Sequence, residues 1–98
     1  MEIPTFNELE SQLFKAIRDG NLQVVQALIQ KGVNLDCKND YGQTPLHHAV
    51  LYEKVTIVEL LLEKGANLDS KNKNGIMPLH HAAALGQESI LETIYLII

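Results

Sequence analysis

Cysteine, positive charge and long apolar runs are all scarce in this sequence, and each scarcity excludes a class of protein. The 98 residues include one cysteine, Cys37, so an intrachain disulfide is excluded and a reducing compartment is favoured. Lys and Arg number 8 against 12 Asp and Glu, and no basic cluster could neutralise a run of phosphates. The few aromatic residues are not interleaved with Lys and Arg, as a base-stacking platform would need. We therefore expect no nucleic-acid partner.

The features of a secreted or membrane-spanning chain are also missing. The first ten residues, MEIPTFNELE, are acidic and contain an early proline, whereas a secretory signal has a basic start and an apolar run. The most apolar segment, ILETIYLII at 90–98, is about half as long as a bilayer span and contains Glu92. We expect no membrane partner and an intracellular location, in the cytoplasm or the nucleus.

Motifs for catalysis or cofactor binding are absent as well. The sequence contains no GxSxG, GxxxxGK[ST], HExxH or GxGxxG. Cys37 would need a neighbouring base and an oxyanion hole to act as a nucleophile, and no motif supplies them, so we expect a semi-exposed loop thiol. We expect no enzyme activity, no catalytic residue and no cofactor. A catalytic role that depends on Cys37 or His81 remains as a residual alternative.

What the sequence does contain is a repeated segment. The stretch GQTPLHHAV at 42–50 nearly recurs as GIMPLHHAA at 75–83, thirty-three residues later. A unit that is too small to bury its own apolar face must be repeated beside itself. Leu13, Leu46 and Leu79 stand at the same spacing, and we expect them to stack in register along one apolar core. Three units therefore fill the chain.

The middle unit predicts two helices followed by a loop. Thr44 can cap a helix with its hydroxyl, and Pro45 takes the first helical position, where a missing N–H costs nothing. A second apolar pattern at helical spacing covers 55–62, and Gly65 is placed to end it in a left-handed conformation. The connection at 65–77 is rich in Asn, Asp, Lys and Gly, which favours a turn and a short extended segment.

The two end units depart from this pattern. In the first, Thr5 and Glu8 predict a capping box, which suits a terminal unit. In the third, Met77 stands where the middle unit has Thr44 and cannot cap, so we expect its first helix to be about 1 kcal/mol less stable. Its second helix, predicted over 87–98, is apolar on several sides, although a terminal unit normally needs a polar outer face.

The period of 33 and the segments DYGQTPLHHAV and IVELLLEKGANLD resemble ankyrin repeats. The resemblance covers about 13–91 and implies an all-α solenoid of three stacked helix-turn-helix units with hairpin-like loops. It implies a single domain over 1–98, with a capping first repeat at about 8–36, a second repeat at about 40–69 and an incomplete third repeat at about 73–98.

The resemblance also separates structural positions from those that contact partners. Partner-contacting positions of the family fall on slots that vary between repeats and that line a concave groove. These slots are Asp40, Tyr41, Gln43, His48, Leu51 and Tyr52 in the second repeat, Lys73, Asn74, Ile76, His81, Ala84 and Leu85 in the third, and Lys15, Arg18 and Asp19 in the first. Large apolar groups on a groove are the usual anchors of an interface. Such groups can equally well cover neighbouring helices. Glu53 and Lys54 depart from the family, which favours Gly and His there.

Two His-His pairs raise the question of a metal site. Adjacent helical residues point about 100° apart, so a site would need His48 and His81 from neighbouring repeats. A closed zinc site takes about four ligands, and Cys37 has no CxxC companion, so we expect no metal. The resemblance implies instead that His47 and His80 hydrogen-bond the loop backbone. We expect His48 and His81 to be solvated groove residues.

These features predict a non-catalytic protein-protein interaction module, a scaffold or adaptor that holds a segment of another protein in its groove. The alternative is a structural end fragment of a longer array, or a chain that associates with itself. It is motivated by the apolar tail, Ile94, Leu96, Ile97 and Ile98, which could dock onto more repeats or onto a second copy.

Overall fold

The computed structural model describes residues 8–97, apart from the side chain of Ile97. Among these residues it contains helices and no strand, which confirms the predicted all-α class. The helices are α1 (Glu8–Asp19), α2 (Leu22–Gln30), α3 (Pro45–Leu51), α4 (Val55–Glu63), α5 (Pro78–Ala84) and α6 (Glu88–Ile97). The capping box predicted at Thr5 and the last tail residue, Ile98, lie outside the described residues.

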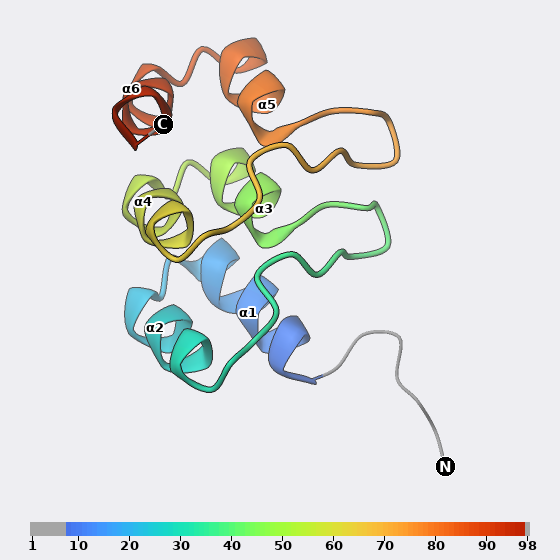
Figure 1. Ribbon diagram of the computed structural model, residues 1–98, viewed down its shortest axis with the longest axis vertical. Coiled ribbons are helices and arrows are strands. Elements are labelled where there is room, and N and C mark those ends of the chain that lie inside the picture. Colours follow the sequence, from blue (N-terminus) through green and yellow to red (C-terminus); the bar gives the residue numbers. More distant parts are fainter. Residues whose placement is uncertain (1–7, 98) are drawn as a thin grey trace.

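The helices form three antiparallel pairs that stack along the long axis of the molecule (Figure 1). Helices α1, α3 and α5 make one layer and α2, α4 and α6 make the other, and each helix contacts the next one in its own layer. The connections that follow α2 and α4 project to one side of the stack. The expected solenoid of helix pairs with projecting loops is confirmed.

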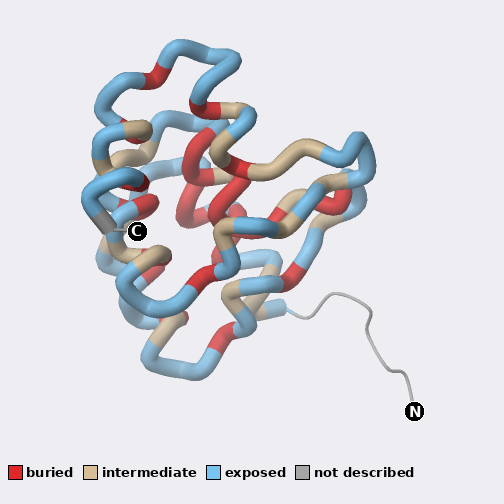
Figure 2. The backbone as a smooth tube through the Cα atoms, turned by 45° about the horizontal axis from the view of Figure 1, so that its top comes forward, coloured by how far each residue is buried: buried red, intermediate tan, exposed pale blue. Residues whose placement is uncertain are grey.

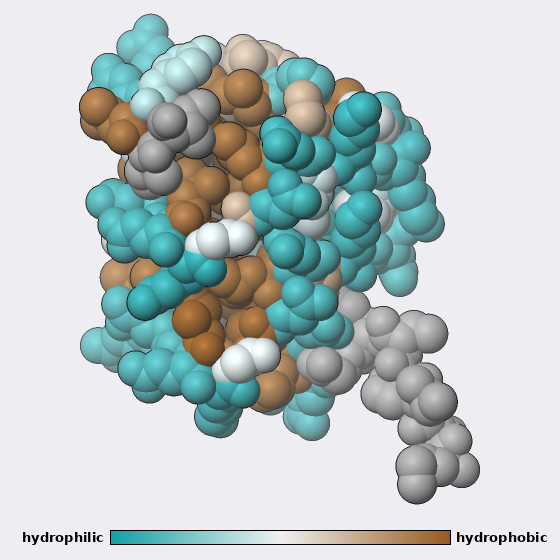
Figure 3. All heavy atoms as spheres, in the orientation of Figure 1, coloured by the Kyte–Doolittle hydropathy of each residue, from teal (hydrophilic) through white to brown (hydrophobic). Residues whose placement is uncertain are grey.

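Packing, not helix propensity, holds these short elements. Helices α3 and α5 have 7 residues each, whereas an isolated helix in water needs about 12–15 residues to be even marginally stable. Figure 2 shows buried positions on the inner sides of the helices, while the outer turns and the loop tips are exposed. Hydrophobic residues on the face in Figure 3 form a strip along the stack, between hydrophilic margins. One continuous core therefore joins all three pairs.

The three leucines at the period of the repeat belong to this core, as predicted. Leu13 and Leu46 are fully buried, and Leu79 packs against the same cluster but is only half-buried. The difference arises because α5 and α6 are the last pair in the described part of the stack, so no following pair covers Leu79. In the second-helix layer, Ile57 joins the predicted Val58 in the core.

The predicted helix start in the middle unit is confirmed. The hydroxyl of Thr44 accepts a hydrogen bond from the His47 amide at 3.3 Å, and Pro45 takes the first helical position. In the reciprocal bond, His47 Nδ1 accepts from the Thr44 amide at 3.1 Å. Helix α5 keeps only one of these two bonds. His80 Nδ1 accepts from the Met77 amide at 3.3 Å, but no side chain caps the helix.

The turns that end the helices use left-handed backbone. Gly65 ends α4 with φ at 87°, as predicted. The turn after α3 instead places Glu53 at φ 56°, and Glu53 is the only non-glycine with positive φ among residues 8–97. The corresponding positions of the other two units are Gly20 and Gly86. The departure from the family at Glu53 is therefore a change of side chain and not of backbone.

The last helix corrects one expectation about the apolar tail. Ile94 was expected to be part of an exposed tail, but it is fully buried in the core together with Ile90. Among the apolar residues of α6 at positions 88–96, Tyr95 and Leu96 are the exposed ones, at 65% and 85%. The apolar residues of α6 thus divide between the chain's own core and its surface. Among residues 8–97, no helix combines the length and the apolar character needed to cross a membrane.

Candidate functional site

The two projecting loops have the same internal hydrogen bonds. In the first loop, Asn39 Oδ1 accepts from the amides of Tyr41 and Gln43, and the Asn39 amide donates to the Gln43 carbonyl at 3.0 Å. Asn72 makes the corresponding bonds in the second loop, where its amide donates to the Ile76 carbonyl at 3.0 Å. Each loop is therefore a hairpin-like turn closed by an asparagine at its base.

The two loops are also bonded to each other. The Lys73 amide donates to the Tyr41 carbonyl at 3.1 Å, and the Asn67 amide donates to Asp36 Oδ1 at 2.9 Å. Gly42 lies at this contact with φ at 74°, and a Cβ on it would be 2.9 Å from the Lys73 amide nitrogen. Hydrogen bonds thus join the two loops into one unit beside the first helices. The tips of these loops carry some of the predicted partner residues.

His47 behaves as the resemblance implies. Its side chain is fully buried, and Nε2 lies 2.7 Å from the carbonyl oxygen of Ile76 in the following loop. Burial lowers the pKa of His47, an effect that the bond to the Ile76 carbonyl partly opposes. His80 keeps the bond within its own repeat but is exposed, and residues 8–97 include no projecting loop after the third helix pair that could meet its second nitrogen.

The expectation that His48 and His81 are solvated is wrong. Both are half-buried, because each ring packs against aromatic rings of its neighbours. The ring of His48 meets Phe14 edge-on at 5.1 Å and Tyr52 at 4.9 Å between centroids, and His81 meets His47 at 5.9 Å. Burial, and then the positive charge of Arg18 beside it, lowers the pKa of His48.

Each of these two histidines keeps a polar atom in an apolar setting. His48 Nδ1 and His81 Nε2 are buried and have no hydrogen-bond partner among the described residues. No three His, Cys, Asp or Glu side chains in the described part of the chain lie close enough together to hold a metal ion.

Cys37 also differs from its expected state. Its side chain is buried, with 6% exposed, and is not a semi-exposed loop thiol. Burial, with the negative charges of Glu10 and Asp36 nearby, raises the pKa of the thiol to about 12. Because the thiolate is the reactive form, Cys37 at neutral pH is a protonated core residue.

The predicted partner residues fall into an exposed and a half-buried group. The exposed members are Lys15, Arg18, Asp19, Asp40, Tyr41, Leu51, Tyr52, Lys73, Asn74, Ala84 and Leu85. The half-buried members are Gln43, His48, Ile76 and His81. The bonded loops bring the tip residues together, and α3 packs against α5. That these residues contact a partner stays a prediction.

Two surface hollows lie beside α1. The first, here called the groove hollow, measures about 390 Å³ and lies between α1, α3 and the base of the first loop. Its lining residues are Ser11, Phe14, Lys15, Arg18, Asn39 and His48. Sequence reasoning missed Ser11, Phe14 and Asn39, because none of them stands at a position that the resemblance assigns to partner contact. The ring contact from Phe14 to His48, which joins two repeats, exists only in the folded chain.

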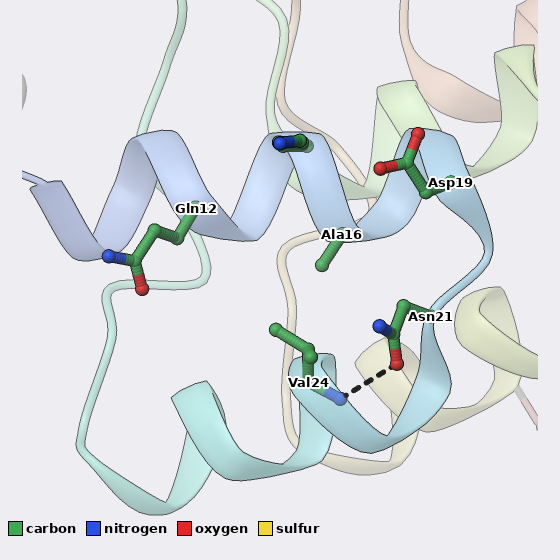
Figure 4. Close-up of a pocket in the computed structure, with 6 residues that line it drawn as sticks. Gln12, Ala16, Asp19, Asn21 and Val24 are labelled. Atoms are coloured by element: carbon green, nitrogen blue, oxygen red, sulfur yellow. Dashed lines mark hydrogen bonds between the residues drawn. The ribbon is translucent and has the colours of Figure 1, made fainter.

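The second hollow lies between α1 and α2 at the end of the stack and measures about 360 Å³ (Figure 4). Gln12, Ala16 and Val24 line the gap between the two helices, and Asn21 caps α2 by accepting from the Val24 amide at 3.2 Å. Val24 is 38% exposed, whereas Ile57, its counterpart one repeat later, is buried against the preceding pair.

Comparison with known proteins agrees with this geometry. The family model described as ankyrin repeats (3 copies) matches residues 10–97. Two proteins of fowlpox virus (strain NVSL) named as ankyrin repeat proteins are similar to parts of the chain. FPV233 is 39% identical over 49 residues, or 50% of this chain and 10% of its own length. FPV223 is 41% identical over 44 residues, or 45% of this chain and 31% of its own length.

A mammalian protein shares a similar stretch. The 2-5A-dependent ribonuclease of Mus musculus is 43% identical over 47 residues, which are 47% of this chain and 6% of the ribonuclease. The chain thus spans less than a third of the length of the relatives that it matches. Since the family model covers all three helix pairs, the chain belongs to the ankyrin repeat family.

Proposed function

We propose that this chain is a protein-interaction module that holds a segment of another protein in the groove between its first helices and its loops. Repeat solenoids stack into extended concave surfaces, and ankyrin repeats generally use theirs to bind proteins. The partner is bound and released unchanged, so the proposal includes no catalytic step. The short similarity to a ribonuclease, over 6% of that enzyme, brings no nuclease activity to it.

The observation that carries the proposal is a group of exposed large side chains in the first-helix layer. Leu51 ends α3 and Tyr52 follows it, with 38% and 41% of their side chains exposed, and Leu85 follows α5 with 53% exposed. Helices α3 and α5 pack against each other, so these side chains border the same surface. Tyrosine is enriched among the anchors of interfaces, because it buries a large area with little loss of conformational freedom.

The loop tips support the same surface from the other side. Tyr41 is 72% exposed, and its carbonyl is bonded to the Lys73 amide, so the two tips keep a common geometry. Because the hydrogen bonds between the two loops are already formed, the loops lose little conformational entropy when a partner binds. We assign the apolar contacts of the partner to the helix ends and the orienting polar contacts to the tips, at Asp40, Lys73 and Asn74.

A double substitution in the groove tests this proposal against a matched pair elsewhere. Tyr52→Ala with Leu85→Ala removes two groove anchors, and Tyr95→Ala with Leu96→Ala removes the same side-chain types from α6. A protein captured by the wild-type chain from the native cell extract should be lost with the groove variant and retained by the α6 variant. Thermal unfolding checks that both variants fold. Unchanged affinity of the folded groove variant for that protein would refute the proposal.

The second candidate function is docking through the C-terminal helix. Leu96 is 85% exposed, and the corresponding positions of the other two repeats carry Gln30 and Glu63. A large apolar side chain at a position that is polar elsewhere suits contact with a second copy or with further repeats. Sedimentation over a range of concentrations should then show association that Leu96→Gln abolishes. A monomer at every concentration would exclude self-association through this helix.

A further inference from the structure

Charge is distributed unevenly between the two helix layers. Helices α4 and α6 carry Glu59, Glu63, Glu88 and Glu92 and no Lys or Arg. In the other layer, α1 carries Glu8, Glu10 and Asp19 but also two cations, Lys15 and Arg18, which lie three residues apart and therefore on one face of the helix. Two cations thus lie together on the groove side of a chain whose net charge is -4.

These two cations lie at the groove hollow. Lys15 and Arg18 both line it and are exposed, and the floor is formed by Phe14 and the half-buried ring of His48. Phe14, His48 and Tyr52 follow one another edge to face, with centroid distances of 5.1 Å and 4.9 Å. The hollow therefore combines two cations at its rim with a row of rings that leads to the groove anchors.

One of the two cations of the hollow, Arg18, has an acidic partner within residues 8–97. This ion pair joins Arg18 Nε to Asp19 Oδ1 at 3.7 Å, with about half of each side chain exposed. Such an exposed pair is worth little and does not prevent Arg18 from binding another carboxylate. The side-chain amide of Asn39 is engaged within the loop. Its Oδ1 accepts from the amides of Tyr41 and Gln43, and its Nδ2 donates to the side chain of Gln43.

We propose that the groove hollow binds an acidic peptide segment of the partner, with a carboxylate between Lys15 and Arg18 and a neighbouring apolar side chain against His48 and Tyr52. This inference rests on the proposed function and adds the chemistry of the partner to it. Arginine and lysine form their strongest hydrogen bonds with carboxylates, and a ring row beside them provides the apolar contact.

The surroundings of His48 favour an acidic over a basic segment. The groups that face its ring are Phe14 and Arg18 from α1 and Tyr52, which directly follows α3. Burial and the charge of Arg18 already oppose a positive charge on this ring. A lysine or arginine of a partner would add a further cation beside Lys15 and Arg18, whereas a carboxylate would be attracted by both.

Selection from a random peptide library tests the inference. A phage-displayed library of random 12-residue peptides is selected on the immobilised full chain, and enriched peptides are measured by fluorescence anisotropy. We expect enrichment of Asp or Glu beside Leu, Phe or Tyr. Lys15→Glu with Arg18→Glu should weaken these peptides about tenfold or more. The matched variant, Lys31→Glu with Lys64→Glu, makes the same charge change at the ends of α2 and α4 and should change affinity less than about twofold.

The possible outcomes separate this inference from the proposed function. Acidic peptides that lose affinity only with the Lys15 and Arg18 variant, and that shift the ring resonances of His48, support it. Peptides without acidic enrichment that depend on Tyr52 and Leu85 but not on the two cations overturn it and leave the proposed function intact. Peptides whose affinity depends neither on Lys15 and Arg18 nor on Tyr52 and Leu85 overturn both this inference and the proposed function. If the charge reversal unfolds the chain, Lys15→Gln with Arg18→Gln provides the same comparison.

Discussion

His47 Nε2 lies 2.7 Å from the carbonyl oxygen of Ile76, so one imidazole joins helix α3 to the loop of the next repeat. The other ring nitrogen, Nδ1, accepts from the Thr44 amide at 3.1 Å, which leaves the proton on Nε2 to be donated to the carbonyl. The ring is fully buried and serves both bonds in its neutral form. The bond thus connects two repeats through an imidazole whose pKa is lowered by burial.

Replacing His47 should therefore cost much more stability than replacing His80, which has the same place in the next repeat. His47→Ala leaves a cavity and a buried carbonyl without its donor, and we expect a loss of about 2 to 4 kcal/mol in the free energy of unfolding. His80→Ala removes an exposed ring and should cost less than about 0.5 kcal/mol. Urea unfolding followed by circular dichroism measures both, and equal losses would contradict the role of the Ile76 bond.

Stability should also fall in mildly acidic solution. Burial lowers the pKa of both His47 and His48 in the folded chain below the ordinary value of 6.5. As pH falls through about 6.5, the unfolded chain takes up protons that the folded chain resists, so unfolding becomes more favourable. The urea midpoint should be lower at about pH 5.5 than at about pH 7.5. In His48→Gln this difference should shrink, and an undiminished difference would rule out a contribution from His48.

Gly42 and Gly75 offer a matched test of the contact between the loops. Both have positive φ, at 74° and 75°, so alanine strains either backbone by about 1 kcal/mol. At Gly42 the new Cβ would also be 2.9 Å from the Lys73 amide nitrogen, while at Gly75 no atom lies within 4 Å. We expect Gly42→Ala to cost at least about 1 kcal/mol more than Gly75→Ala in urea unfolding. Similar losses in the free energy of unfolding for the two variants would show that the loops move apart easily to accept the new Cβ.

Glu53 should be replaceable by glycine with a gain in stability. Its φ of 56° is unfavourable for a residue with a Cβ, and the other two repeats have glycine there. Glu53→Gly should raise the free energy of unfolding by about 1 kcal/mol. The control, Glu53→Ala, removes the charge but keeps the Cβ and should give no such gain. If alanine stabilises the chain as much as glycine does, charge and not backbone strain is responsible.

Elements that depend on local chemistry could be predicted from the sequence. The start of α3 at Pro45 and the end of α4 before Gly65 follow from a hydroxyl cap, a missing N–H and a left-handed glycine. The period of 33 predicted the shared core of Leu13 and Leu46, because equivalent residues of stacked units take equivalent places. The missing side-chain cap of α5 at Met77 followed from the absence of a hydroxyl group at that position.

The candidate site was predictable only in part, because its members come from different repeats. The variable slots indicated which positions of each repeat face the groove, but not that Phe14 would cover the ring of His48. The same limit explains the error at Cys37, whose burial depends on how its loop packs and not on its neighbours in the sequence. Ile94 looked like part of an apolar tail, and contact between α4 and α6 buried it.

By itself, the sequence determined the repeat, the helix pairs and the turns, because caps, glycines and apolar spacing act within a few residues. Only the tertiary structure decided which equivalent side chains of the repeats differ in burial and in hydrogen bonding. His47 and His80 have the same neighbours in sequence, yet one is buried and the other exposed. The physical reason is that the environment of each repeat depends on the repeat that follows it, which supplies a carbonyl to His47 and, within the described residues, none to His80.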